Sequence, residues 1–270
     1  ADITIEQQLR TFRVFVRYCE SIEGVEQGVS DKLIIPKVSK GEAVRDDAIT
    51  HEEATAIIDF LKRFHYASKE HVIFHLLYHT GMRRGAVHAL DVTDWNPEEA
   101  YLEVRHRPDA SISTPLKLKQ EGERHLSILD ASLVDAVDDY LSHHRVDHAE
   151  PDGREPLFTT ENGRISGNAI QALVYRVTRP CMYAESCPHG REKTSCEAVT
   201  NSNRLSRCPS NVSPHPVRRS AIHHHLNSNV SKSIASERMA VSVDTLEEHY
   251  DSRSNEERRK ARLTELENLE

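Results

Sequence analysis

The sequence is poor in several residue types, and each shortage excludes a class of protein. Among its 270 residues, aromatic side chains make up 6% and tryptophan occurs once. No apolar run approaches the roughly 18 residues of a membrane span, so no membrane partner is expected. No signal peptide is visible, and the five cysteines are not spread as a disulfide framework. We therefore expect a cytoplasmic protein with reduced thiols.

Basic residues are also outnumbered by acidic residues. The chain has 35 Lys and Arg against 43 Asp and Glu, a formal net charge of −8. Nucleic-acid-binding proteins are usually basic, so global charge argues against that class. Local charge differs: residues 176–219 hold eight Lys and Arg against three Glu, whereas residues 130–152 hold seven acidic residues and one arginine. A basic face on an acidic protein remains compatible with DNA binding.

Apolar periodicity divides the chain into a short N-terminal part and one large domain. Residues 1–25 carry helical spacing, but a single helix cannot bury its own apolar face. We interpret them as the end of a small helical domain that is truncated here. Residues 26–49 contain Pro36 and Gly41 without periodicity, as expected of a linker. The main domain then spans residues 50–270.

Helix start and stop signals outline the main domain. Thr50 and Glu53 form a capping box for a helix to Phe64, and Ser68 caps a helix that stops at Gly81. Further helices are expected at residues 83–90, 131–144, 166–179, 216–227, 231–238, 243–250 and 255–269. Short strands are expected at residues 100–106, 115–119 and 124–129, with a turn at 120–123. The fold class is therefore mainly α with a small antiparallel β-sheet (α+β).

Three short motifs carry candidate chemistry. A T-G-M-R turn ends at Arg83, an H-P-V-R helix start runs from His215 to Arg218, and an H-Y-D stretch surrounds Tyr250. Taken singly, each has an ordinary explanation: a surface arginine, a capping histidine, a packed tyrosine. His215 and Arg218, however, share one face of a first helical turn, where backbone N–H groups and the helix dipole favour a phosphate.

Together and in this order, the motifs resemble the catalytic domain of the tyrosine recombinase (phage integrase) family. They look most similar to integrase-like proteins of halophilic archaea. The family also places a lysine on a β-hairpin, and the L-K-L-K-Q-E-G-E-R stretch supplies Lys117 and Lys119. The resemblance covers roughly residues 50–262. It implies a tyrosine recombinase catalytic domain, with residues 1–25 as the last helix of a helical, SAM-like core-binding domain.

The resemblance implies a site-specific recombinase or integrase that breaks and rejoins double-stranded DNA through a 3′-phosphotyrosyl intermediate. Tyr250 would be the nucleophile, while Arg83 and Arg218 would neutralise the charge of the transition state. His215 would accept a proton or donate a hydrogen bond to the phosphate. Lys119, with Lys117 as the alternative, would protonate the leaving 5′ oxygen.

The family chemistry also carries expectations about cofactors and partners. No cofactor is required for catalysis, and the enzyme would act as a homotetramer on DNA. The helix expected at residues 255–269 would either dock on a neighbouring subunit or form a solvated tail.

Two positions depart from the family pattern. Many members have a second histidine directly after the H-x-x-R arginine, where this chain has Arg219. They also have a histidine or tryptophan some nine residues before the tyrosine, where this chain has Val241. Arg238 is the candidate for this sixth catalytic position. The departures keep an alternative open, namely a DNA-binding regulator that retains the fold with weak or no catalysis.

Most of the cysteines gather in a polar insert at residues 180–212. They are Cys181, Cys187, Cys196 and Cys208. Their spacings of five, eight and eleven intervening residues differ from the C-x₂-C pairs of zinc ribbons. Both a structural zinc site, with His189 as an alternative ligand, and a set of reduced thiols are compatible with the pattern.

Overall fold

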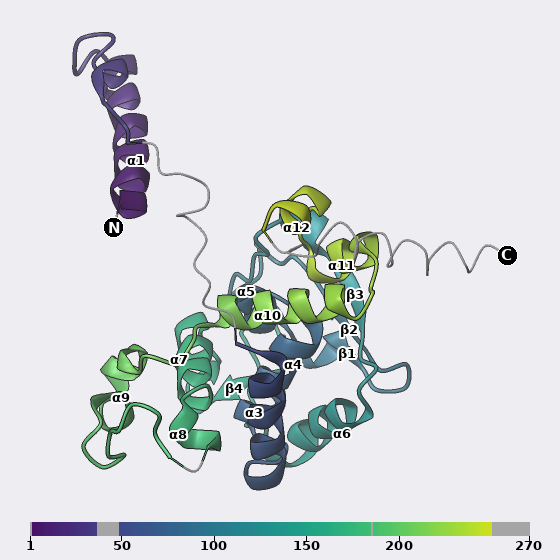
Figure 1. The fold of residues 1–270 in the computed structure, drawn as a ribbon. Coiled ribbons are helices and arrows are strands. Elements are labelled where there is room, and N and C mark those ends of the chain that lie inside the picture. Colours follow the sequence, from purple (N-terminus) through teal and green to yellow (C-terminus); the bar gives the residue numbers. More distant parts are fainter. Residues whose placement is uncertain (1, 37–48, 185, 250–270) are drawn as a thin grey trace, which may run out of the picture. The chain divides into compact units, whose positions relative to one another are not determined.

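The computed structural model describes residues 2–36, 49–184 and 186–249. The chain divides into two compact units, Ala1–Asp46 and Asp47–Glu270 (Figure 1). The helix expected at residues 255–269 lies outside the described residues. Within the described part, no helix combines the length and the apolar composition that crossing a bilayer requires.

The first unit is a helix with a return segment. Helix α1 (Asp2–Ser21) is followed by a short 3-10 helix, η1 (Ser30–Lys32). The Glu20 carboxylate accepts hydrogen bonds from the Ser30 backbone N–H at 2.7 Å and from its hydroxyl at 2.9 Å, which lowers the pKa of Glu20. The Arg13 guanidinium donates to the Leu33 carbonyl. These bonds hold the segment after α1 against the helix.

The second unit is built mostly of helices. In chain order the α-helices are α3 (His51–Phe64), α4 (Lys69–Thr80), α5 (Arg84–Ala89), α6 (Ala131–Asp139), α7 (Gly167–Val177), α8 (Pro180–Tyr183), α9 (Glu197–Thr200), α10 (Pro214–Asn227), α11 (Lys232–Met239) and α12 (Val243–His249). Shorter turns are the 3-10 helices η2 (Val92–Asp94), η3 (Lys119–Gly122) and η5 (Ser202–Arg207), and the π-helical η4 (Tyr140–His144).

Helix α4 forms the centre of this unit. Almost all of its residues are buried, as expected of a helix that is enclosed on every side. Helices α3, α6, α7 and α10 pack around it (Figure 1). The predicted caps are confirmed: Thr50 and Glu53 form a capping box for α3, and the Ser68 hydroxyl caps α4. The core is therefore organised around the helix that leads into the T-G-M-R turn.

A small antiparallel sheet lies beside the helices. Its strands are β1 (Trp95–Asn96), β2 (Tyr101–Val104) and β3 (Arg124–Ser127), in that order, and Leu102 pairs with Leu126 in the core. A second pair, β4 (Thr159–Thr160) and β5 (Gly163–Arg164), forms a short hairpin. The expected fold class, mainly α with small antiparallel β-structure, is confirmed.

The strand expected at residues 115–119 is wrong. This segment lies in the long connection between β2 and β3, and β1 takes the third place in the sheet. The apolar alternation misled because only Leu116 is buried, whereas Leu118 is 36% exposed. A single buried side chain does not define a sheet face. Lys117 and Lys119 therefore do not share a strand face, and Lys119 adopts φ 52° at the start of η3.

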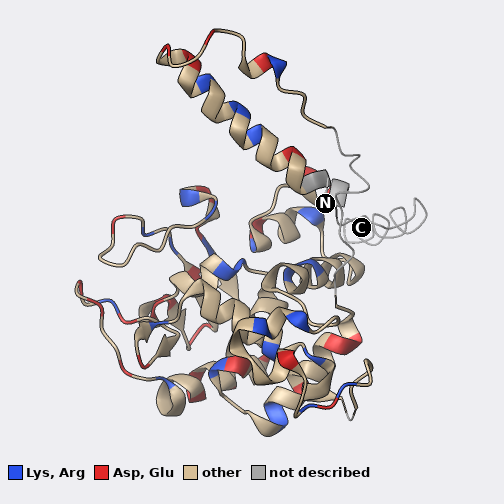
Figure 2. Cartoon of the chain, turned by 90° about the vertical axis from the view of Figure 1, so that its left-hand side faces the viewer, with Lys and Arg blue, Asp and Glu red and all other residues tan. Residues whose placement is uncertain are grey.

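A buried ion network joins the segment after α5 to the β4–β5 hairpin. Asp91 accepts hydrogen bonds from Arg154 Nε at 2.8 Å and from Arg164 Nη2 at 2.5 Å. Arg164 also bonds Glu150, and Arg107 contacts Asp91 at 3.4 Å. Figure 2 shows acidic and basic segments interspersed through this unit. Arg164 also donates to the His88 and Leu90 carbonyls, so the network fixes the end of α5 and the segment that follows it.

Candidate active site

The turn between α4 and α5 requires a glycine for two reasons. Gly81 ends α4 in the left-handed conformation, with φ 60°. A Cβ at this position would lie 3.0 Å from Sδ and Cε of Met239. The Thr80 hydroxyl donates to the Leu76 carbonyl at 2.6 Å and accepts from the Met82 N–H at 3.2 Å, which braces the turn. Arg83 follows, half-buried, at the N-cap of α5.

The start of α10 brings a second arginine to the same place. Pro214 and Pro216 lie in the first turn, where their missing N–H groups leave no bond unmade. Arg218 is 3% exposed, and its Nη1 donates to the Gly81 carbonyl and the Met239 carbonyl, each at 2.6 Å. Arg83 Nη1 donates to the next carbonyl, Ala240, at 2.7 Å. The end of α11 thus brings Arg83 and Arg218 together.

His215 lies among these cations. Desolvation by the surrounding atoms is the largest cause that lowers its pKa, followed by the charges of Arg218, Arg219, Arg83 and Lys117. The imidazole is therefore mainly neutral at neutral pH, and the residue remains exposed to solvent. The concentration of positive charge around it, within reach of a helix N-terminus, matches the requirements of a phosphodiester site.

An arginine that the sequence analysis did not assign lies beside this group. Arg124, at the start of β3, donates from Nε to the Arg238 carbonyl and from Nη1 to the Gly122 carbonyl, both at 2.7 Å. Burial, then the charges of Arg83 and Arg238, lower the pKa of Arg124 to about 10. The only sequence signal for Arg124 is its place at the end of the L-K-L-K-Q-E-G-E-R stretch, which also contains Lys117 and Lys119.

The family is decided by comparison with known proteins. The model of the phage integrase family matches residues 47–256. The chain belongs to the phage integrase family. The expectation of a tyrosine-type site-specific recombinase is therefore confirmed. No curated protein matches the chain.

Solved recombinase structures share the fold. The crystal structure of XerA recombinase has a TM-score of 0.54 at 15% identity, covering 98% of this chain and 76% of that one. The Tn1549 transposon integrase in complex with transposon right-end DNA has a TM-score of 0.64 at 14% identity, covering 97% and 79%. A lambda integrase dimer bound to a COC′ core site has 0.57 at 12% identity, covering 94% and 61%.

The remaining candidate positions of the recombinase, Arg238, Val241 and Tyr250, lie in the C-terminal part of the chain. Arg238 Nη1 donates to the Ser127 carbonyl of β3 at 3.0 Å. The guanidinium proposed for the sixth catalytic position is therefore hydrogen-bonded to the sheet. Val241 is 7% exposed, and its carbonyl accepts from the Ser236 hydroxyl at 2.6 Å. Tyr250 lies outside the described residues, directly after α12.

The cysteine-rich insert of the recombinase folds into α8, α9 and η5. Cys181 is buried in α8, and burial raises the pKa of its thiol, with smaller contributions from Cys208 and Cys187. All the cysteines are free thiols. Across the described ranges, no three His, Cys, Asp or Glu side chains converge as a metal site.

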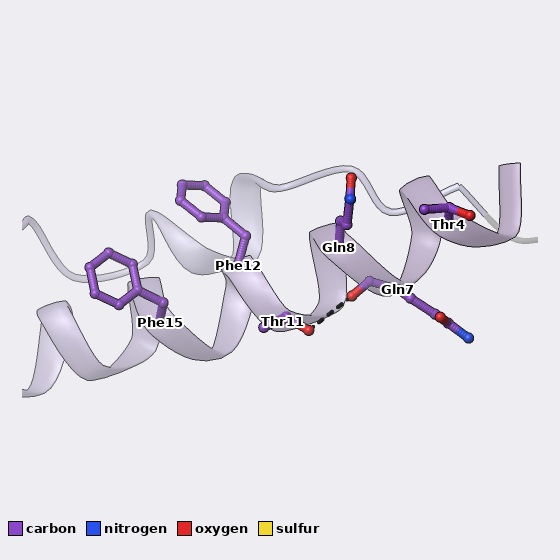
Figure 3. A pocket seen from close by; sticks show the side chains of 6 residues that line it. All are labelled: Thr4, Gln7, Gln8, Thr11, Phe12 and Phe15. Atoms are coloured by element: carbon purple, nitrogen blue, oxygen red, sulfur yellow. Dashed lines mark hydrogen bonds between the residues drawn. The ribbon is translucent and has the colours of Figure 1, made fainter. Parts of the chain in front are cut away.

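A surface hollow on the first unit is separate from this chemistry. Figure 3 shows its lining side chains along α1: Thr4, Gln7, Gln8, Thr11, Phe12 and Phe15. The Thr11 hydroxyl is bonded to the Gln7 carbonyl at 3.0 Å. The lining contains no ionisable side chain, so the hollow offers no general acid or base.

Proposed function

We propose that this recombinase cleaves and rejoins double-stranded DNA through a covalent bond between Tyr250 and the 3′ phosphate. The tyrosine oxygen attacks the scissile phosphorus while the bond to the 5′ oxygen breaks, and that oxygen leaves with a proton from a lysine. In the second step, a 5′ hydroxyl attacks the phosphotyrosine and releases the tyrosine. The phosphodiester energy is kept, so the exchange needs no ATP.

The observation that carries the proposal is the meeting of Arg83 and Arg218 at the end of α11. Their Nη1 atoms bond the successive carbonyls of Ala240 and Met239 at 2.7 and 2.6 Å, and Tyr250 follows α12 in the sequence. Fixed guanidinium groups stabilise charge on non-bridging phosphate oxygens because they need no reorganisation as the transition state forms.

His215 and the lysines complete the proposed machinery. With its pKa lowered by desolvation and neighbouring cations, neutral His215 can accept the tyrosine proton or donate one hydrogen bond to the phosphate. Lys119 remains the proposed proton donor because its spacing to Gly122 and Arg124 fits the family hairpin. The charge of Lys117 on His215 supports it as the alternative. Arg238 is retained in an auxiliary role at most, because its guanidinium bonds β3.

Covalent trapping tests the proposal. The protein is incubated with a nicked DNA substrate, without metal ion or ATP, and is then quenched with detergent. We expect a protein–DNA adduct that is absent in Tyr250→Phe, and we expect Arg218→Lys to slow its formation by about 10²–10³-fold. DNA binding without any adduct would favour the alternative, a DNA-binding regulator that has lost catalysis through the changes at Arg219 and Val241.

Partners and setting follow from the same proposal. The printed descriptions of the Tn1549 and lambda integrase structures include DNA, which supports a DNA partner for this chain. We propose a homotetramer on two DNA segments, a cytoplasmic location, and residues 1–25 as the end of a core-binding domain.

The proposed likeness to proteins of halophilic archaea is supported by the formal charge of −8. A free energy of unfolding that rises in molar potassium chloride would test it.

A structural zinc ion remains a separate proposal that rests on composition. Cys181, Cys187, Cys196 and Cys208 would hold it, although the described side chains do not converge on a metal position. Metal analysis of protein purified without chelator tests it. Stoichiometric zinc that is lost in Cys181→Ser would support the site, and metal-free, fully folded protein would refute it.

A further inference from the structure

The C-terminal end of α11 is held by three arginines from three different parts of the chain: strand β3, helix α10 and the turn before α5. Arg124 of β3 donates to the Arg238 carbonyl at 2.7 Å, Arg218 of α10 to the Met239 carbonyl at 2.6 Å, and Arg83 to the Ala240 carbonyl at 2.7 Å. We call this set of three bonds the arginine clasp. It connects segments that are distant in sequence to three successive backbone oxygens.

A helix end is suited to this arrangement. The last carbonyls of a helix lack intrahelical partners and carry the negative end of the dipole, so cations bind there favourably. Ala240 ends α11 in the left-handed conformation with φ 48°, and Val241 N–H bonds the Ser236 carbonyl at 3.1 Å. The carbonyls are therefore presented in a fixed direction just before α12.

Arg124 differs from the other two members of the clasp. Arg83 and Arg218 belong to the proposed phosphate site, whereas Arg124 uses two N–H groups on the Arg238 and Gly122 carbonyls. Burial of the Arg124 guanidinium disfavours its charged form, and so do the positive charges of Arg83 and Arg238. Together they lower the pKa of Arg124 to about 10. The two hydrogen bonds of Arg124 offset this electrostatic cost, because they fix the end of α11 against β3.

We propose that Arg124 is a positioning residue for DNA cleavage. By fixing the Arg238 carbonyl, it aligns the next two carbonyls, which orient Arg218 and Arg83 toward the scissile phosphate. The same bond fixes the segment that leads into α12. The proposal rests on the proposed function, because it assigns Arg124 a role in that reaction.

The test compares Arg124→Ala and Arg124→Lys with wild type in single-turnover cleavage of a nicked substrate. We expect cleavage to slow by about 10- to 100-fold in Arg124→Ala, because small misplacements of catalytic groups have effects of this size. DNA affinity should be unchanged. Arg124→Lys should recover part of the rate, because one ammonium can bond the Arg238 carbonyl without spanning both acceptors.

A second substrate separates positioning from loss of stability. Replacing a non-bridging oxygen of the scissile phosphate by methyl removes the charge that Arg83 and Arg218 neutralise. If Arg124 acts through them, the rate gap between Arg124→Ala and wild type should shrink on this methylphosphonate. Arg145→Ala is the matched control, because Arg145 also bonds carbonyls, those of Pro156 and His148, in the connection from η4 to β4. It should keep the wild-type cleavage rate.

The outcomes are distinguishable. A wild-type rate in Arg124→Ala, or a loss of the same size on both substrates, would overturn the positioning role while leaving the phosphotyrosyl proposal intact. Absence of any adduct in the wild-type protein would instead overturn the proposed function. If Arg124→Ala does not fold, the methylphosphonate comparison is made with Arg124→Lys, and the same two outcomes decide.

Discussion

Gly81 shows how much a single residue can determine in this site. Replacing it by alanine should lower the free energy of unfolding by about 1–2 kcal/mol, because an L-residue at φ 60° is strained. The new Cβ would also press on Met239 at 3.0 Å, and the Met239 carbonyl orients Arg218. We therefore expect slower DNA cleavage as well, measured beside denaturant unfolding.

Gly85 is the matched control for this prediction. It lies within α5, and a Cβ there would meet no atom within 4 Å. Gly85→Ala should raise the free energy of unfolding by about 0.5–1 kcal/mol, because alanine is the better helix former. If both variants changed stability in the same direction, the special role of the left-handed conformation at Gly81 would be refuted.

A substrate with a modified leaving group distinguishes the roles of Lys117 and Lys119. A substrate with sulfur in place of the 5′ bridging oxygen releases a thiolate, which needs no proton. The lysine that serves as general acid should therefore lose about 10²–10⁴-fold in cleavage rate on normal DNA when changed to alanine, and little on the sulfur substrate. We expect this pattern for Lys119→Ala, and Lys117→Ala serves as its control. The reverse pattern would transfer the role to Lys117.

At the residue scale, the sequence revealed the candidates that belong to contiguous motifs. Arg83, His215 and Arg218 were proposed from such motifs, and the structure brings their charges together. Arg124 was missed because its partners are the Arg238 and Gly122 carbonyls, and a backbone carbonyl has no sequence signature. The placement of Tyr250 stays a prediction.

At the scale of secondary structure, the ion network around Asp91 makes a testable claim about stability. Asp91 is 2% exposed and accepts bonds from Arg154 and Arg164. Asp91→Asn keeps the shape but leaves these guanidinium charges under-compensated. We expect the free energy of unfolding to fall by about 3–5 kcal/mol, as measured in denaturant.

An exposed ion pair provides the comparison. Asp147 pairs with Arg145 at 3.0 Å, but its side chain is 98% exposed. Asp147→Asn should change stability by less than about 1 kcal/mol. Equal losses in Asp91→Asn and Asp147→Asn would show that burial does not strengthen the network.

Helices were predictable from the sequence because their signals are local. Thr50 with Glu53, Ser68 and Gly81 each mark an end within one turn, and the structure shows all of these caps. Strands were harder, because β1 and β4 are two residues long and exist only through pairing with distant partners. The strand expected at residues 115–119 failed for the same reason, since pairing is decided by contacts outside the segment.

At the scale of the whole molecule, buried histidines on α4 make stability depend on pH. His71 and His75 are 0% and 4% exposed, and His79 lies one turn further along the helix. Burial is the largest cause that lowers the pKa of all three, to about 4 for His71 and His79. For His75, a hydrogen bond of 3.0 Å to Asp130 opposes the effect of burial.

The sign of the pH dependence follows from these shifts. A histidine with a lowered folded-state pKa is neutral in the fold, while in the unfolded chain it binds a proton below about pH 6.5. The contribution of these neutral histidines to the free energy of unfolding is therefore fully present above pH 6.5. It falls as the pH drops from there toward 4, by up to about 1.4 kcal/mol per pH unit for each such histidine. Denaturant titrations across this window should show the decline.

His71→Asn should reduce that slope by about one proton, or about 1.4 kcal/mol per pH unit, because asparagine does not titrate. The amide oxygen can replace Nδ1 as acceptor for the Ala67 N–H, which now bonds it at 3.2 Å, so the fold is preserved. His143→Asn, at an exposed position of η4, is the matched control. An unchanged slope in His71→Asn would mean that the unfolding transition does not expose α4, and that the core around this helix survives acid.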